Sequence, residues 1–400
     1  MEDNRIIYLD NAATTKMHEE VLKEMIPYFV ENYGNASSIY SVGRDSKAVL
    51  DEKRAVIASI LGAKDNEIFF TGGGSESDNW AIKGVAFANR KKGNHIITTK
   101  IEHHAVLHTC QYLEKQGFEV TYLPVDENGF IKLQDLENAI KPNTILISVM
   151  FANNEIGTIE PIKEIGEIAK KHNIYFHTDA VQAVGHVPIN VNDLGVDLLS
   201  FSGHKFCGPK GVGCLYIRKG VKIDSLIHGG AQERGKRAST ENIAGIVGMA
   251  KALEISTNDM KKETNRILEL RERLINGIFE KIPHVRLNGD REKRLPSNVN
   301  FSIKYIEGES LLLMLDMMGI CASSGSACTS GSLDPSHVLL AIGLPHEIAH
   351  GSLRLSIGRD TTKEDIDKVL EVLPGIVDRL RRMSPLYDEV TKKGEGNNVQ

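Results

Sequence analysis

The sequence lacks the features that would place this chain in a membrane or on a nucleic acid. The best candidate for a membrane span, residues 311–320, is too short to cross a bilayer and is interrupted by Asp316. The formal net charge is −5, and no long basic run is present, which argues against a nucleic-acid partner. The first ten residues lack the basic and apolar regions of a signal peptide. These absences predict a cytoplasmic protein with neither a membrane nor a nucleic-acid partner.

The chain is also poor in cysteine. It has five, an odd number, spread along the sequence without a C-x-x-C pair: Cys110, Cys207, Cys214, Cys321 and Cys328. This pattern predicts reduced thiols rather than a disulfide framework, and it excludes a zinc knuckle, so we expect no metal. All except Cys328 lie in apolar contexts typical of buried, inert thiols, although Cys207 is only two residues past Lys205.

The length of 400 residues fits two domains better than one small domain. Between about residues 45 and 218, helical spacing alternates with short β-rich runs, which predicts an α/β domain with a mostly parallel sheet. The helix is expected at 45–63, and the strands at 67–73, 95–100, 144–150, 174–180 and 197–203. In such sheets, ligands bind beyond the carboxyl ends of the strands, where the polar motifs of this chain fall.

After residue 240 the pattern changes to that of a smaller α+β domain. We expect a long amphipathic helix at about 258–282, strands at 298–305 and 351–358, and a closing helix at 363–383. The predicted organisation is a large domain of residues 14–258 and a small C-terminal domain of residues 259–385 that includes residues 1–13. The polar tail, 386–400, is expected to be disordered.

Two motifs at strand ends are typical of a pyridoxal 5'-phosphate site. In HTDAVQ (177–182), Asp179 would keep the pyridine nitrogen protonated and Gln182 could donate to the ring hydroxyl oxygen. In SGHK (202–205), Lys205 would carry the cofactor through its amine, and Ser202 and His204 could reach the phosphate. An isolated SGHK would be read as a surface lysine, but the second motif 26 residues upstream favours the cofactor site.

A third motif, TGGGSESDN (71–79), has the pattern of a strand, a turn and a helix start, whose free N–H groups bind anions. Alone it is a weak signal, because glycine turns before helices are common.

The most specific signal is Cys328 in SSGSACTSGS (323–332), which has no apolar periodicity. We expect this segment to be mobile, because it cannot bury enough surface to offset its ordering entropy. A thiol with a pKa of about 8.5 is a few per cent ionised at neutral pH, a deficit of roughly 2 kcal/mol. That deficit is small beside an enzymatic barrier reduction of about 8 kcal/mol or more, so no strongly activating neighbour is required.

Together these motifs resemble the cysteine desulfurases of the NifS/IscS group. The resemblance extends to LDNAATT (9–15), YGNASS (33–38) and HGGAQERGKRASTEN (228–242). It implies a class-V-aminotransferase-like, fold-type I enzyme that binds pyridoxal 5'-phosphate and acts as a homodimer. It further implies that L-cysteine becomes L-alanine, that Cys328 receives the sulfur as a persulfide, and that an iron–sulfur scaffold or another carrier protein accepts it.

The resemblance also assigns roles to individual residues. The phosphate would lie on Gly74 and Ser75, with Thr240 reaching the phosphate of the neighbouring subunit. His103, in EHHAV (102–106), would stack on the ring and move protons, whereas His104 is expected to be a surface residue. Asn154 would lie near the ring hydroxyl and the substrate carboxylate, and Arg354 would hold that carboxylate bidentately. We expect Asn153 to be a turn residue and Arg359 to be structural.

Three positions depart from the family pattern: Ala36 replaces proline, Tyr40 replaces histidine and Ser239 replaces glycine. Three alternatives stay open at this point. An aminotransferase or a selenocysteine lyase would share the fold, and a sulfur carrier or scaffold would keep the fold without catalysis. Intact Lys205, Asp179 and Cys328 argue against the last.

Overall fold

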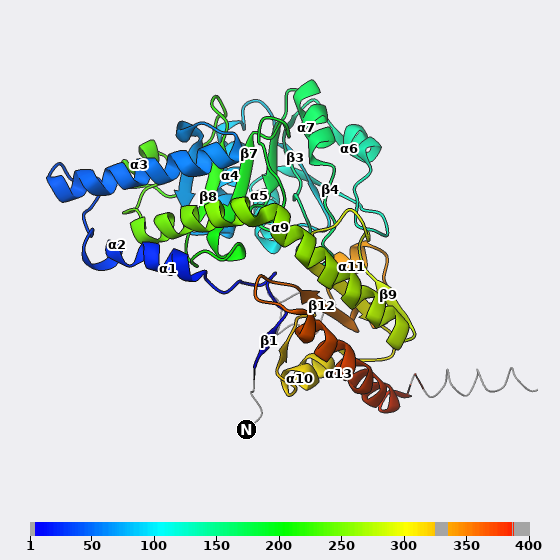
Figure 1. The fold of residues 1–400 in the computed structure, drawn as a ribbon. Coiled ribbons are helices and arrows are strands. Elements are labelled where there is room, and N and C mark those ends of the chain that lie inside the picture. Colours follow the sequence, from blue (N-terminus) through cyan, green and yellow to red (C-terminus); the bar gives the residue numbers. More distant parts are fainter. Residues whose placement is uncertain (1–4, 325–334, 386, 388–400) are drawn as a thin grey trace, which may run out of the picture.

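The computed structural model describes residues 5–324, 335–385 and 387 (Figure 1). Cys328 and all but one residue of the polar tail lie outside the described residues, so the predictions made for them stay predictions. Within the described part of the chain, no helix is both long enough and apolar enough to cross a membrane.

A seven-stranded sheet forms the centre of the larger part of the molecule. Its strands, in spatial order, are β2 (Ile68–Thr71), β8 (Gly213–Ile217), β7 (Leu198–Ser202), β6 (Tyr175–Asp179), β5 (Thr144–Ser148), β3 (His95–Thr99) and β4 (Glu119–Leu123). Only β8 runs antiparallel to its neighbours, so the predicted mostly parallel sheet is confirmed.

Helices cover both faces of this sheet. Adjacent strand residues contribute to different apolar cores: Leu199 and Phe70 belong to one, and Leu198 and Phe69 to the other. Side chains alternate between faces along a strand, so a strand buried on both faces must be apolar throughout. The covering helices include α3 (Ser41–Leu61), α4 (Gly74–Ala88), α5 (His104–Lys115), α6 (Leu133–Ala139) and α7 (Ile162–Lys171).

The long helix α9 (Ile243–Lys281) begins about 15 residues earlier than the prediction of 258–282, which is therefore wrong at its start. Its first turns are apolar on nearly every side, and residues 244–250, 252 and 253 are all buried. A helix that is buried all round shows no amphipathic period, so this half gave no helical signal. The helix runs without a break through residue 258, where the domain boundary was placed.

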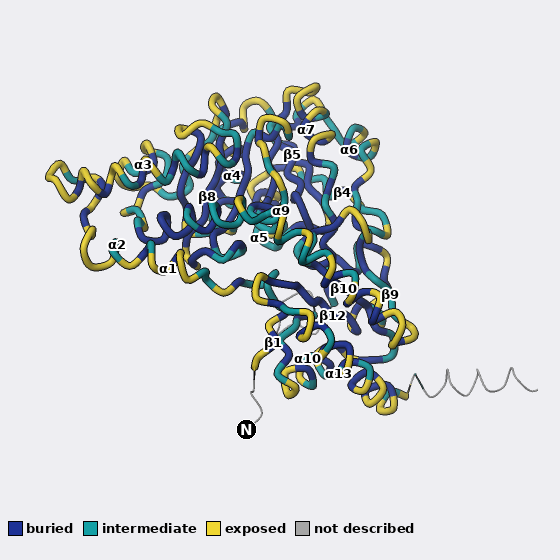
Figure 2. The backbone as a smooth tube through the Cα atoms, in the orientation of Figure 1, coloured by how far each residue is buried: buried dark blue, intermediate teal, exposed yellow. Residues whose placement is uncertain are grey.

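A smaller antiparallel sheet lies beyond α9, in the order β12 (Ser352–Ser356), β10 (Asn298–Ile303) and β9 (Val285–Leu287). Its core is separate and includes Leu9, Leu274, Phe301 and Val369. The N-terminal segment joins this part because β1 (Ile7–Tyr8) pairs with β11 (Ile320–Cys321). Figure 2 shows the buried backbone as two groups, one in each part. The domain boundaries themselves stay a prediction.

The remaining elements are short, apart from the closing helix α13 (Lys363–Arg382), which agrees with the predicted 363–383. They are α1 (Glu19–Met25), α2 (Pro27–Val30), η1 (Asp65–Glu67), η2 (Gly203–Lys205), α8 (Gln232–Gly235), α10 (Gly308–Asp316), α11 (His337–Ala341) and α12 (His346–Ala349).

Candidate active site

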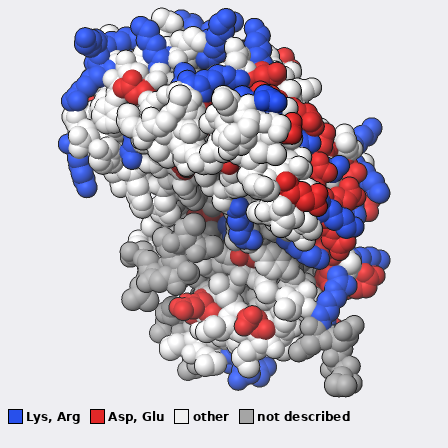
Figure 3. Space-filling view, turned by 90° about the vertical axis from the view of Figure 1, so that its left-hand side faces the viewer, with Lys and Arg blue, Asp and Glu red and all other residues white. Residues whose placement is uncertain are grey.

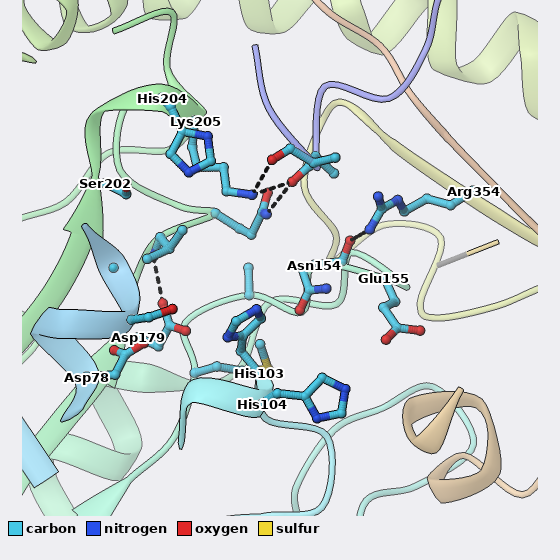
Figure 4. Close-up of a pocket in the computed structure, with 18 of the residues that line it drawn as sticks. Asp78, His103, His104, Asn154, Glu155, Asp179, Ser202, His204, Lys205 and Arg354 are labelled. Carbon is cyan, nitrogen blue, oxygen red and sulfur yellow. Dashed lines mark hydrogen bonds between the residues drawn. The ribbon is translucent and has the colours of Figure 1, made fainter. Parts of the chain in front are cut away.

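The carboxyl ends of β3, β5, β6 and β7 and the start of α4 surround a cavity of about 420 Å³ (Figure 4). Of the predicted site residues that the structure describes, all except Thr240 line it: Gly74, Ser75, His103, Asn154, Asp179, Gln182, Ser202, His204, Lys205 and Arg354. Strand ends of a parallel sheet meet at one edge, which is why motifs far apart in the sequence converge here.

The amine of Lys205 is directed into this cavity from the turn η2, which directly follows β7. Its Nζ donates hydrogen bonds to the carbonyl oxygens of Ala12 and Ala13, at 2.7 and 2.9 Å. Gln182 donates to the same Ala12 oxygen, at 2.9 Å. The N-terminal segment thus closes one side of the cavity with carbonyl groups, and these hold the amine in place.

Asp179, the last residue of β6, presents a buried carboxylate to the cavity. Its Oδ1 accepts a hydrogen bond from the backbone N–H of Val181, at 2.9 Å. Burial raises the pKa of Asp179, and the positive charge of Lys205 acts in the opposite direction. A carboxylate in this setting is stabilised by a cation, such as a protonated ring nitrogen.

A second buried acid, Asp78 of α4, also lines the cavity and was not among the predicted site residues. Burial raises its pKa, and the charge of Asp179 raises it further. His177 lies 3.6 Å from Asp78, and its two ring nitrogens bond the hydroxyls of Ser148 and Ser200, at 2.8 and 2.9 Å. Burial lowers the pKa of His177 to about 3, so this ring is neutral. The signal for Asp78 was its place one helical turn after Gly74.

The cavity wall at the start of α4 is suited to hold an anion. The helix α4 starts at Gly74, and its free N–H groups point out of the first turn. Gly73 precedes it with φ of 154°, a conformation that a residue with a side chain adopts only under strain. Ser202 and His204 line the same end. Burial and the charge of Lys205 lower the pKa of His204 to about 4, so its ring is neutral.

His103 and Asn154 border the middle of the cavity. His103 is the N-cap of α5, and its Nδ1 accepts the N–H of Ala105 at 3.1 Å, which places the proton of the neutral ring on Nε2. Burial first, and Lys205 second, lower the pKa of His103 to about 4. Asn153 is buried and bonds the backbone of its own turn, as expected.

Arg354 projects from the buried strand β12 into the cavity. Its Nη2 lies 2.8 Å from the carboxylate of Asp10, and its Nη1 donates to the carbonyl oxygen of Asn154 at 3.0 Å. The guanidinium is therefore aimed by two groups that the sequence analysis did not foresee. Arg359, which was expected to be structural, pairs with Asp259 and does not line this cavity.

Some predicted residues lie outside this cavity, and others differ from the prediction in their exposure. Thr240 is exposed and lines a different pocket of the same chain. Ser239 beside it has φ of 114°, a backbone conformation that favours the glycine expected from the family. His104, expected at the surface, lines the cavity instead. Cys110 and Cys214 are buried as predicted, but Cys207 and Cys321 are half-buried, because Cys207 lies in a turn and β11 has only two residues.

Comparison with known proteins assigns this fold and cavity to a family. The model of the aminotransferase class-V family matches residues 7–369. The cysteine desulfurase IscS of Clostridium botulinum (strain Hall) is 64% identical over 394 residues, which cover 98% of this chain and 99% of that protein. The chain belongs to the cysteine desulfurases of the class-V family. Members of this family depend on pyridoxal 5'-phosphate, as the sequence motifs predicted.

Solved structures agree with this assignment. A NifS-like protein superimposes with a TM-score of 0.89 at 41% identity, covering 94% of this chain and 100% of that one. A structure described as SspA in complex with cysteine has a TM-score of 0.78 at 38% identity, covering 88% of this chain and 98% of that one.

The residues of the cavity fit the cofactor of this desulfurase family. A primary amine, a buried carboxylate that gains from a cation, and a helix start that favours an anion line one space. These match the aldehyde, the ring nitrogen and the phosphate of pyridoxal phosphate. Among residues 5–324, 335–385 and 387, no group of side chains is arranged to hold a metal ion.

Proposed function

We propose that this desulfurase converts free L-cysteine to L-alanine and transfers the sulfur to its own Cys328 as a persulfide. The observation that supports this most is the meeting of Lys205, Asp179 and Arg354 around one cavity. An amino-acid substrate needs a cation for its carboxylate, and Arg354 is the arginine that lines this space. The related structure described with cysteine supports the choice of substrate.

Bound pyridoxal phosphate supplies an electron sink for the negative charge that develops at the substrate Cα. Lys205 would attach the cofactor through Nζ and afterwards move the proton at Cα. Asp179 would hold the ring nitrogen protonated, and Gln182 would donate to the ring hydroxyl oxygen. His103 would lie against the ring and move a proton through Nε2, since its Nδ1 is engaged by Ala105.

The phosphate would be held by the N–H groups of Gly74 and Ser75 together with the side chains of Ser202 and His204. Thr240, which is exposed, would reach the phosphate in a neighbouring subunit. Asn154 and Arg354 would hold the substrate carboxylate.

The sulfur step requires Cys328 as a thiolate. It attacks the sulfur of the substrate, an S–S bond forms, the Cβ–S bond breaks, and the carbon takes a proton to give alanine. The balance is one L-cysteine and one thiol converted to one L-alanine and one persulfide, without an external oxidant.

A homodimer is supported by an apolar surface on and beside α1 and α2. Phe29, Tyr33 and Ile39 are 61%, 74% and 89% exposed. Surfaces of this kind usually mark an interface. Figure 3, which views the molecule from the left-hand side of Figure 1, shows a broad area of this face with few charged side chains below a group of Lys and Arg. The sulfur acceptor would be a scaffold or carrier protein in the cytoplasm.

Product analysis tests the proposed function. The purified holoenzyme should form alanine and persulfide-derived sulfide from L-cysteine in equal amounts in the presence of a reductant. Formation of a keto acid with transfer of the amino group would show an aminotransferase instead. Turnover of selenocysteine alone would show a selenocysteine lyase, and a cofactor-free, inactive protein would show a carrier or scaffold.

A further inference from the structure

The imidazole of His337 lines the cavity, but the steps above do not use it. His337 is the first residue of α11, and its Nε2 lies 3.0 Å from the backbone carbonyl oxygen of Glu102. A carbonyl oxygen only accepts hydrogen bonds, so Nε2 must carry the proton of the neutral ring. Nδ1 is then the basic nitrogen. An imidazole oriented through its other nitrogen by a fixed acceptor is the usual arrangement of a general base.

The surroundings keep this ring neutral. Burial is the main cause that lowers the pKa of His337, and His108 adds to it, while the bond to the carbonyl of Glu102 acts in the opposite direction. The ring of His104 lies 4.8 Å from that of His337, measured between centroids, and 5.0 Å from that of His108. The other titratable groups beside this cluster are His103, which His337 affects, and Glu155, which raises the pKa of His104. A neutral imidazole can accept a proton at pH 7.

Two described residues, one before and one after Cys328 in the sequence, bond residues that line the cavity. Before it, the backbone of Ser323 pairs with that of Arg354, with N···O distances of 3.1 and 2.6 Å. After it, the hydroxyl of Ser336 donates to the buried carboxylate of Glu155, which also lines the cavity. Lys205 and His103 already serve the cofactor in the proposed function. A thiol that ionises in this cavity passes its proton to a base, and His337 is a neutral base in the cavity wall.

We propose that Nδ1 of His337 accepts the proton of a thiol of the reaction. The S–H bond breaks, the proton moves to Nδ1, and the electron pair stays on sulfur as a thiolate. The thiol belongs either to the substrate or to Cys328. This inference rests on the proposed function and adds to it a residue that ionises the sulfur at neutral pH.

The pH dependence of alanine formation by His337→Gln tests the inference. The glutamine amide can still donate to the carbonyl of Glu102, but it cannot accept a proton. Since a thiol with a pKa of about 8.5 is roughly 3% ionised at pH 7, the rate should fall by up to about thirtyfold at pH 7 and recover near pH 9. His108→Gln is the matched control, because His108 is exposed and does not line the cavity. Its rate should equal that of the wild type at both pH values.

A second variant separates chemistry from structure. Added imidazole should restore alanine formation by His337→Ala at pH 7 and leave the wild type unchanged. In a Cys328→Ser background, the substrate carries the only reacting thiol. If the substrate thiol is the source of the proton, His337→Gln in this background should change the pH dependence of the spectral response to cysteine. If the Cys328 thiol is the source, the pH dependence should stay unchanged.

The inference is overturned if His337→Gln keeps the wild-type pH profile, or if it loses the same factor at every pH and imidazole does not rescue His337→Ala. A wild-type enzyme that forms no alanine would refute the proposed function itself, which makes the two failures distinguishable.

Discussion

Arg354 donates from Nη2 to the carboxylate of Asp10, at 2.8 Å, so its guanidinium is already oriented before a substrate arrives. Asp10 follows β1, and Arg354 lies in β12, 344 residues later in the chain. An N-terminal residue therefore positions the group that is proposed to bind the substrate. The carboxylate of Asp10 already occupies one N–H group of this guanidinium, so a substrate carboxylate would compete with Asp10 for Arg354.

Replacing this arginine should weaken substrate binding more than cofactor binding. Arg354→Lys loses the bidentate fork, and a hydrogen bond to a charged group contributes about 1.5–3 kcal/mol, so KM for cysteine should rise by roughly 10- to 100-fold. Steady-state kinetics and cofactor absorbance measure the two effects. Arg359→Lys is the control, since Arg359 does not line the cavity, and an equal rise in its KM would contradict the assignment.

Lys205→Ala should lose the visible absorption of covalently bound cofactor, or retain a substrate-bound species that never turns over. Lys205 is the only lysine that lines the cavity among the described residues. Absorbance spectra and alanine formation check both outcomes. Lys219→Ala changes an exposed lysine outside the cavity lining and should behave as the wild type. Normal turnover by Lys205→Ala would remove the assignment.

Cys328→Ser should separate binding from sulfur transfer. The variant should bind cofactor and respond spectrally to cysteine, because neither step needs the thiol, but it should release no alanine. Chromatographic detection of alanine in a single turnover measures this. Cys321→Ser should keep wild-type activity, since the half-buried Cys321 lies outside the cavity lining. Wild-type alanine release by Cys328→Ser would exclude the persulfide route.

Ser239→Gly should stabilise the protein. Ser239 has φ of 114°, where a side chain causes strain of about 1–3 kcal/mol, while glycine adds an entropic cost of roughly 0.5–1 kcal/mol. The free energy of unfolding in urea should rise by about 1 kcal/mol. Ser225, which is not among the residues with positive φ, provides the control. Ser225→Gly should give no gain, and an equal gain there would show that strain is not the cause.

Glu160 should make stability depend on pH. Burial raises its pKa to about 8, so between its ordinary value of 4.5 and 8 the folded state binds more protons than the unfolded state. The free energy of unfolding should therefore decrease as the pH rises through this range, by at most about 5 kcal/mol. Urea unfolding at pH 5, 7 and 9 should show that Glu160→Gln removes this fall. Glu292→Gln changes an exposed residue and should leave the fall intact. A wild-type slope retained by Glu160→Gln would contradict the prediction.

The sequence by itself determined the elements that repeat a local pattern. The parallel strands β3, β5, β6 and β7 are short β-rich runs that end near polar motifs, and the closing helix α13 shows a clear amphipathic period, so these elements were located within a few residues. The parallel strand β4 was not predicted. The motifs around Lys205, Asp179 and Gly74 were readable because each combines reactive side chains with a strand end, where ligands bind.

The tertiary structure alone decided what depends on distant contacts. The first half of α9 gave no signal, because burial on all sides removes the amphipathic period. Asp10 meets Arg354, and His337 meets the carbonyl of Glu102, across 344 and 235 residues of sequence. No local pattern encodes such pairs, since they arise only when distant segments of the chain pack around one cavity. The raised pKa of Asp179 and the lowered pKa values of the histidines likewise follow from burial, which is a property of the packed chain.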